Sequence, residues 1–327
     1  MELDMSNFLL NNTYVSNVNP CYKIATYLPT ETPTTLCLLF NVFLGSISAV
    51  TVCGNLLVII SIIYFRQLHT PTNALILSLA VADLLVGAMV FPLTMEFSIS
   101  SCMHHQDIFC KVRGSFDITL SICSILNLCC ISIDRYYAVC QPLVYRNRIS
   151  SHVIVLMILV SWGVPAVVAI SLVGFNQVEC KQNCFLTVVL GKILIVLITF
   201  YLPLLVMICI YLKIFSVAQR QAYSIHSNKH YGGVVSKMEN KATKTLAIVM
   251  GVFLLCWLPS ILCTTVLTFS KASQPGPLAE ILNWLALSNS TFNPFIYALF
   301  YRWFRSAFRM IISGKIMLGN FTDLKLY

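Results

Sequence analysis

Seven long apolar stretches, separated by polar breaks, constrain the fold of this chain more than any other feature. Each approaches the roughly 20 residues that a helix needs to cross about 30 Å of hydrocarbon. Inside lipid an open sheet edge would leave backbone groups without hydrogen bonds, so these stretches are expected to be helices. The sequence therefore predicts an all-α membrane protein, a seven-transmembrane helix bundle with spans at 36–63, 72–97, 107–140, 151–174, 186–218, 240–269 and 278–301.

The segments on either side of the spans complete the predicted organisation. Residues 1–35 form an N-terminal tail, residues 36–301 the transmembrane domain, and residues 302–327 an amphipathic helix with a short tail. In the last part apolar residues recur at helical spacing, with arginines on the other flank: Phe304, Phe308 and Ile311. This pattern predicts a short eighth helix lying on the inner leaflet.

Basic residues set the orientation of the bundle. Only 10% of residues are charged, against about a quarter in soluble domains, and most lysines and arginines follow spans one, three, five and seven. The positive-inside rule makes that side cytoplasmic, so we expect a multi-pass plasma-membrane protein with an extracellular N-terminus. No cleavable signal is predicted, and the first span is expected to direct insertion. The net charge of +9 is then explained by contact with anionic lipid and a cytosolic partner, and not by binding to nucleic acid.

The outer face carries a glycosylation sequon and several cysteines. Asn11 begins an Asn-x-Thr sequon on the side where the modifying enzyme acts, so its glycosylation is predicted. Disulfides persist on this oxidising side, but the cysteine pattern alone does not settle the pairing of Cys21, Cys102, Cys110, Cys180 and Cys184.

Asp83 lies in the middle of the second span, where a charge costs at least about 2.5–3.5 kcal/mol. Oxygen ligands suit hard cations, so a polar core around Asp83 could hold an allosteric sodium ion. The alternative is a hydrogen-bonded cluster in which Asp83 is partly protonated. No other cofactor and no metal centre are expected. The residues that could face Asp83 are Asn55, Ser124, Asn289 and Asn293.

Two charged positions on the third span point to opposite ends of the membrane. Asp134 and Arg135 end the span at the cytoplasmic face, where they can pair locally. Alternatively Arg135 reaches Glu239 at the start of the sixth span, a contact between helix ends that a switch can break. Asp117 lies 17 residues earlier, about 25 Å away, and so falls in the outer half of the membrane.

Asp117 can serve as the counterion of an extracellular ligand. Two structural alternatives compete with this role. Arg113 stands one helical turn earlier and can form a salt bridge with Asp117. Lys192, near the outer end of the fifth span, can pair with it across the bundle.

The order of these features resembles that of rhodopsin-like G protein-coupled receptors over almost the whole chain. The matching motifs are Gly54-Asn55, Leu79-Ala80-Val81-Ala82-Asp83, Cys110, Asp134-Arg135-Tyr136, Trp162, Pro203 with Tyr211, Cys256-Trp257-Leu258-Pro259 and Asn293-Pro294-Phe295-Ile296-Tyr297. The resemblance implies a Cys110–Cys184 disulfide and a G protein as partner. The residues that it assigns to G protein contact and switching are Asp134, Arg135, Tyr211, Glu239 and Tyr297.

A finer match is to the trace amine-associated receptors. Residues 289–304 carry their paired Asn-Ser and late Tyr-x-Trp-Phe, and residues 131–140 fit them as well. This resemblance implies a second disulfide, Cys21–Cys180, an olfactory role, a small amine as ligand and coupling to a stimulatory G protein. The ligand-binding residues that it implies are Asp117, Ile118, Ser121, Lys192, Ile195, Thr199, Trp257, Ile261, Asn283 and Leu287.

The predicted pocket departs from the amine-receptor pattern. Ser260-Ile261 stand where aromatic residues are usual, and Leu287 replaces a tyrosine, so fewer rings surround the amine. Lys192 adds a positive charge near the pocket mouth. The ligand could then be zwitterionic, or the lysine could extend outward to water.

Two other classes of membrane protein are disfavoured by the sequence. A transporter would be expected to show internal repeats, and a channel a ring of pore-lining charges, and neither is visible. No arrangement of nucleophile and base or cluster with metal-ligand spacing indicates an enzyme.

Overall fold

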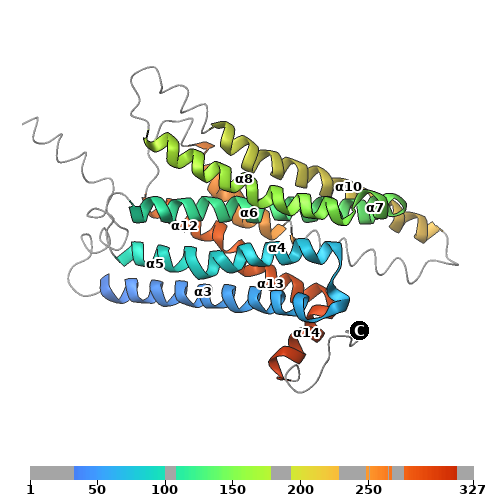
Figure 1. Ribbon diagram of the computed structural model, residues 1–327, viewed down its shortest axis with the longest axis horizontal. Coiled ribbons are helices and arrows are strands. Elements are labelled where there is room, and N and C mark those ends of the chain that lie inside the picture. Colours follow the sequence, from blue (N-terminus) through green and yellow to red (C-terminus); the bar gives the residue numbers. More distant parts are fainter. Residues whose placement is uncertain are drawn as a thin grey trace, which may run out of the picture.

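The computed structural model describes residues 33–99, 108–177, 193–227, 248–249, 251–263, 265–266 and 276–314, and all statements below concern these parts of the chain. Seven helical segments lie along one another as a bundle there (Figure 1). They are α3 (Pro33–Tyr64), α4 (Pro71–Leu85) with α5 (Phe91–Ile99), α6 (Ile108–Cys140), α8 (Ser151–Gln177), a fifth helix from Ile193 that includes α10 (Leu202–Ser227), the helix Gly251–Cys263, and α12 (Gly276–Leu287) with α13 (Asn289–Phe300). The predicted helix bundle is confirmed.

Five of the described helices are long and apolar enough to cross a membrane, and the helix Gly251–Cys263 is a shorter apolar one. Their outward-facing side chains are mostly large and apolar, as expected of a lipid-facing surface. The five apolar segments are Asn41–Tyr64, Pro71–Met95, Gly114–Cys140, Ser151–Ser171 and Ile193–Val217.

Two helical features differ from the prediction. The fifth helix was expected to end at residue 218, but α10 continues to Ser227 because Gln219 and Arg220 are good helix formers and the backbone can stay helical beyond the apolar region. The break after α6 contains the helix α7 (Pro142–Arg148), which begins with a proline at its first position. Neither the extension of α10 nor the helix α7 could be predicted from the apolar stretches alone, because both lie outside them.

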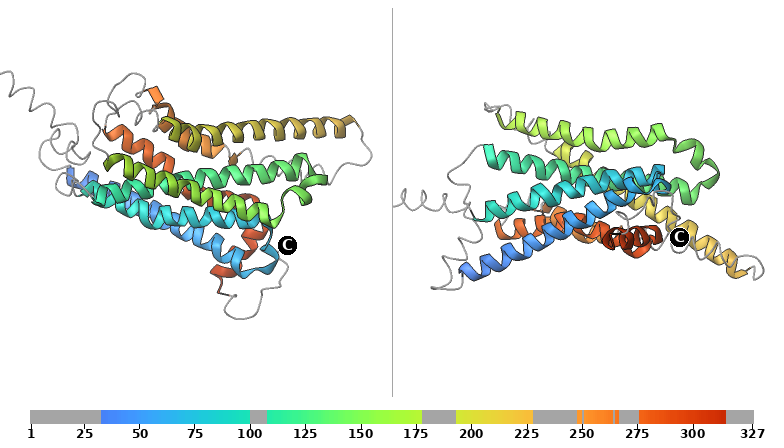
Figure 2. Two further views of the ribbon diagram at one scale, coloured as in Figure 1. Left: turned by 45° about the horizontal axis from the view of Figure 1, so that its top comes forward. Right: turned by 60° about the horizontal axis from the view of Figure 1, so that its bottom comes forward.

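α14 (Arg302–Ile312) occupies the segment for which an amphipathic eighth helix is predicted. Figure 2 shows α14, in dark red, as a short helix separate from the long helices of the bundle. It buries Phe304 and Ala307 against the end of α3, while Ile312 and Arg309 are exposed. Its position on the inner leaflet stays a prediction.

α6 is the central helix of the bundle and packs against α4, α8 and α10 (Figure 1). Polar side chains join these helices inside the core. The Trp162 indole on α8 donates to Ser78 Oγ on α4 at 3.0 Å. The Ser161 hydroxyl shares its proton between the Ile158 carbonyl at 2.9 Å and Asn127 Oδ1 on α6 at 3.3 Å. These bonds fix the faces that the helices turn toward one another.

Two π-helical turns precede prolines inside the spans: η3 (Val86–Val90) before Pro92 and η4 (Leu197–Tyr201) before Pro203. In η3 the Phe91 N–H donates to the Val86 carbonyl. The next carbonyl, that of Gly87, would take its hydrogen bond from residue 92, but Pro92 has no N–H. Ser48 Oγ on α3 instead donates to the Gly87 carbonyl at 2.7 Å. A side chain of a neighbouring helix thus satisfies the backbone that the π-turn frees.

Candidate functional site

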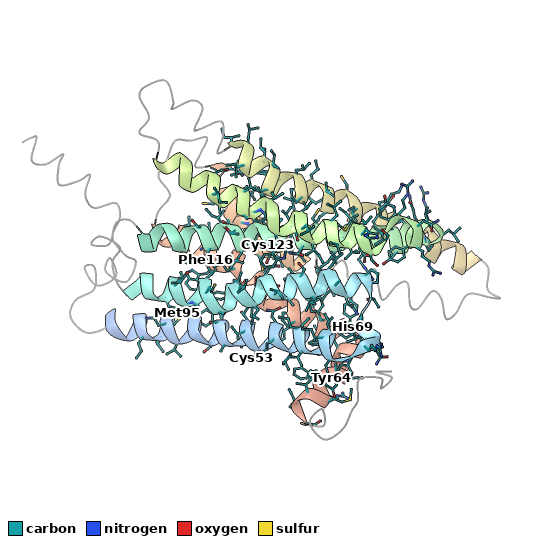
Figure 3. The ribbon with its side chains drawn as sticks, viewed as in Figure 1. Cys53, Tyr64, His69, Met95, Phe116 and Cys123 are labelled. Carbon is teal, nitrogen blue, oxygen red and sulfur yellow. The ribbon has the colours of Figure 1, made fainter. Side chains whose placement is uncertain are left out.

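Asp117 lies on the N-terminal half of α6, next to Phe116, which Figure 3 places nearer the start of that helix than Cys123. Its carboxylate accepts hydrogen bonds from Ser121 Oγ at 3.4 Å and from Asn283 Nδ2 on α12 at 3.0 Å. The structure therefore brings together three of the residues predicted to bind ligand, from two helices.

The two predicted alternatives for Asp117 are not tested by this geometry. The side chain of Arg113 and the whole of Lys192 lie outside the described parts of the chain. Ser121 and Asn283 are the partners of Asp117 that the structure describes, and both are neutral donors. Hydrogen bonds of this kind orient a carboxylate without cancelling its charge.

Aromatic and apolar side chains from α5, α6 and α12 form a cluster with members close in sequence to Asp117 and Asn283. Trp284 follows Asn283 on α12 and stacks on Phe91 of α5, with ring centroids 5.5 Å apart. Leu287 is only 2% exposed and packs in the same cluster with Leu120 of α6. The prediction missed the Trp284–Phe91 pair, although the adjacency of Trp284 to Asn283 was a usable signal.

Other predicted ligand-binding residues occupy different environments. Ile118 is 40% exposed on α6, whereas Thr199 is buried in η4 and donates its hydroxyl to the Ile195 carbonyl at 2.6 Å. Ile261 packs on the core cluster around Phe253. Ile118 is therefore accessible at the surface of α6, whereas Thr199 is buried and its hydroxyl is hydrogen-bonded within its own helix.

Trp257 lies deeper, between two aromatic rings. Its ring centroid is 5.9 Å from that of Phe200 and 6.3 Å from that of Phe253. The neighbouring Tyr201 hydroxyl hydrogen-bonds Thr265, joining the fifth and sixth helices. These contacts place Trp257 where the fifth and sixth helices meet.

Asp83 forms the polar core in the middle of the bundle. It is fully buried and accepts from Ser124 Oγ at 2.8 Å and from Asn293 Nδ2 at 2.6 Å. Asn55 instead donates to the Thr51 and Ser290 carbonyls, at 2.9 and 3.1 Å. Of the four residues expected to face Asp83, Ser124 and Asn293 therefore hydrogen-bond to it, and Asn55 does not.

Sodium binding in this core stays a prediction. The oxygen atoms of Asp83 and Ser124 are the donor set that a sodium ion would use. Asn289 is buried too, and its Nδ2 has no partner among the described groups. An amide N–H cannot ligate a cation, so Asn289 could contribute only through its oxygen.

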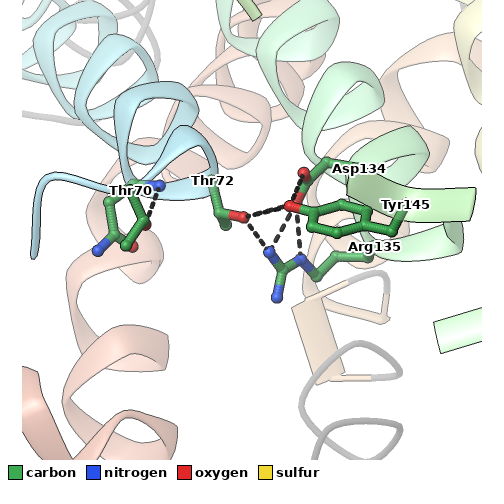
Figure 4. A network of polar contacts seen from close by, with 6 residues as sticks. Thr70, Thr72, Asp134, Arg135 and Tyr145 are labelled. Carbon is green, nitrogen blue, oxygen red and sulfur yellow. Dashed lines mark hydrogen bonds and ion pairs between the residues drawn. The ribbon is translucent and has the colours of Figure 1, made fainter. Parts of the chain in front are cut away.

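Asp134 is the centre of a polar network at the cytoplasmic end of α6 (Figure 4). It is fully buried and accepts from Arg135 Nη2 at 2.6 Å, from Thr72 Oγ1 at 2.9 Å and from the Tyr145 hydroxyl at 2.9 Å. Arg135 also donates to Thr72 Oγ1. The local Asp134–Arg135 pair that was one predicted alternative is therefore present, while Glu239 lies outside the described residues.

Thr72 and Tyr145 were missed by the sequence reasoning. Burial raises the pKa of the Tyr145 hydroxyl above its ordinary value of 10, so this group stays protonated and donates to Asp134 at neutral pH. Thr72 stands at the start of the second span and Tyr145 in the break after the third, and no spacing rule links either residue to Asp134.

The two tyrosines predicted to take part in switching lie in separate clusters. The Tyr211 hydroxyl on α10 is 3.1 Å from Ser132 Oγ on α6. Because Ser132 donates its own proton to the Leu128 carbonyl, it accepts from Tyr211. Tyr297 is buried on α13 beside Phe304 of α14.

Leu143 is 96% exposed on α7, close in sequence to the Asp134 network. A single exposed apolar residue is ordinary on a protein surface, so the exposure of Leu143 by itself indicates no partner. The remaining predicted features are Cys21, Cys180, Cys184 and Asn11, which lie outside the described residues, and Cys110, whose side chain is not described.

Comparison with known proteins shows extended similarity. The profile of the family described as "7 transmembrane receptor (rhodopsin family)" matches residues 54–297. Trace amine-associated receptor 1 of Macaca mulatta and of Homo sapiens are each 42% identical over 299 residues, 85% of this chain and 88% of theirs. Trace amine-associated receptor 4 of Mus musculus is 42% identical over 312 residues, 89% of this chain and 90% of its own.

Proposed function

The chain belongs to the rhodopsin family of seven-transmembrane receptors, and within this family we propose that it binds a small extracellular amine through Asp117 and activates a stimulatory G protein. It is a multi-pass membrane receptor of the trace amine-associated type and not an enzyme. Its orientation, with the N-terminus outside the plasma membrane, and an olfactory role belong to the same proposal.

The observation that carries the amine proposal is the geometry of Asp117. One oxygen of its carboxylate accepts from Ser121 on α6 and the other from Asn283 on α12. The negative charge is therefore held in a fixed orientation by two helices, which suits an ammonium group. The printed names of the relatives refer to trace amines, which agrees with this chemistry.

The proposal extends to the cytoplasmic side. Arg135 lies near the C-terminal end of α6, and the short helix α7 with its exposed Leu143 follows α6 in the chain. Ligand binding then favours the helix arrangement in which these groups engage the G protein, because a ligand shifts an equilibrium toward the state that it binds better.

Asp117→Asn tests the ligand site. The asparagine can accept from Asn283 and donate to Ser121, so the local hydrogen bonds can persist while the charge is lost. Losing one partner of a buried charged pair costs roughly 2–5 kcal/mol, about 30- to several-thousand-fold in potency. Ser121→Ala keeps the charge and is the matched control, with an expected loss of less than about tenfold.

The measurement is the concentration dependence of a second messenger for a panel of amines, diamines and amino acids, with surface amount recorded in parallel. Unchanged potency in well-expressed Asp117→Asn would reject the amine site. Poor expression with unchanged potency would instead assign Asp117 to a salt bridge with Arg113 or Lys192. A response to amino acids alone would favour the zwitterionic alternative.

A further inference from the structure

We propose that Tyr201 is a positioning residue of the proposed amine site: its hydrogen bond to Thr265 holds the sixth helix, and with it Trp257 and Ile261, against the fifth helix. The inference rests on the proposed function, in which Trp257 and Ile261 contact the amine. Tyr201 itself does not touch the amine in this scheme, and it acts only through the helix that it holds.

The π-turn η4 places two neighbouring side chains of the fifth helix against the sixth. The Phe200 ring lies 5.9 Å from that of Trp257, and the Tyr201 ring stands at 89° to the Phe200 ring with its hydroxyl on Thr265. Trp257 and Thr265 are eight residues apart, about 12 Å along a helix. The fifth helix therefore contacts the sixth at two levels from adjacent positions.

Pro259 lies between these two levels. It has no N–H and so removes a backbone hydrogen bond, and a helix bends most easily at such a point. The aromatic contact at Trp257 holds only the segment before the proline. Ile261 follows the proline and stands one helical turn before Thr265, so the Tyr201 bond holds the segment that carries Ile261.

The surroundings of the two hydroxyl groups make this bond hard to replace. Tyr201 and Thr265 are half-buried, and the residues that follow them, Leu202 and Val266, are 54% and 63% exposed on the lipid-facing surface. Lipid offers no hydrogen-bond partner to a hydroxyl that loses its own. Each group is therefore best satisfied by the other, which keeps the two helices together.

Four variants isolate the bond. Tyr201→Phe and Thr265→Val each remove one hydroxyl and keep the shape, and the double variant closes a thermodynamic cycle. Thr265→Ser keeps the hydroxyl. Ser216→Ala is the matched control on the fifth helix, because its hydroxyl bonds only the Leu212 carbonyl of the same helix.

Two measurements on the purified full-length receptor need no ligand. Hydrogen–deuterium exchange of residues 251–263 reports the looseness of the sixth helix, and thermal unfolding reports stability. From the strength of hydrogen bonds between membrane helices, each single variant should exchange about 3- to 15-fold faster and unfold about 1–3 °C lower. The double variant should be no worse than the more affected single variant, while Thr265→Ser and Ser216→Ala should match the unmodified receptor.

A third measurement links the bond to the amine site. Phenethylamine, a small primary amine, serves as the probe in a second-messenger assay at equal surface amount. Tyr201→Phe and Thr265→Val should lower its potency about 3- to 15-fold and leave the maximal response unchanged, because Trp257 and Ile261 are displaced but still present. Thr265→Ser should keep the potency of the unmodified receptor.

Additive losses in the double variant would overturn the proposal, because the two side chains would then act independently. Unchanged exchange in both single variants would overturn it as well. If the unmodified receptor responds to phenethylamine and the exchange effects are coupled, unchanged potency would refute the positioning role. Coupled effects in a receptor that answers no amine would support the Tyr201–Thr265 bond and count against the proposed function. If Tyr201→Phe is poorly expressed, the comparison of Thr265→Val with Thr265→Ser decides.

Discussion

Gly54→Ala should destabilise the receptor because α3 and α13 approach too closely at this point to admit a methyl group. A Cβ on Gly54 would lie 3.0 Å from both Cβ and Cγ of Pro294. The proline ring is rigid and cannot rotate away, so the helices must separate. Asn293 precedes Pro294 and donates to Asp83 at 2.6 Å, so the separation also strains the polar core.

The magnitude follows from two opposed effects. Overpacking a tight contact costs about 1–3 kcal/mol, whereas replacing a helical glycine by alanine gains about 0.5–1 kcal/mol. Gly54→Ala should therefore lose up to about 2.5 kcal/mol, with a central value of about 1 kcal/mol. Gly163→Ala on α8 is the matched control, since its Cβ would meet nothing within 4 Å and only the gain remains.

Thermal unfolding of the purified proteins in one detergent measures the difference. At roughly 2 °C per kcal/mol, Gly54→Ala should unfold about 2 °C, and at most about 5 °C, below the unmodified receptor. Gly163→Ala should unfold at the same temperature or slightly above it. If Gly54→Ala proves as stable as Gly163→Ala, the close α3–α13 contact does not limit stability and the reasoning is refuted.

Two further predictions concern covalent and backbone contacts. Peptide mapping without reduction should recover Cys110–Cys184 and Cys21–Cys180, and a Cys102–Cys184 peptide would contradict this scheme. Ser48→Ala should leave the Gly87 carbonyl of the π-turn without its donor and cost about 1–3 kcal/mol in thermal unfolding. Ser46→Ala, whose hydroxyl bonds only the Val42 carbonyl of its own helix, should have little effect, and equal losses in both would count against the role of Ser48.

Part of the candidate site could be predicted from single positions. Asp83, Asp117 and the Asp134–Arg135 pair were found because charge is costly within apolar spans, and a costly residue needs a partner or a role. The family resemblance added Ser121 and Asn283, which the structure places against Asp117. Thr72 was not found, because a threonine carries no such cost and its partner is 62 residues away.

The sequence by itself determined the bundle, its spans and the positions of the intramembrane charges, because hydropathy and backbone satisfaction act along the chain. The tertiary structure decided which polar groups meet, because that depends on how each helix is rotated and how deep it lies. Asn55 illustrates the difference. It was expected among the groups facing Asp83, yet its amide donates to the Thr51 and Ser290 carbonyls because α3 packs against α13 at Gly54.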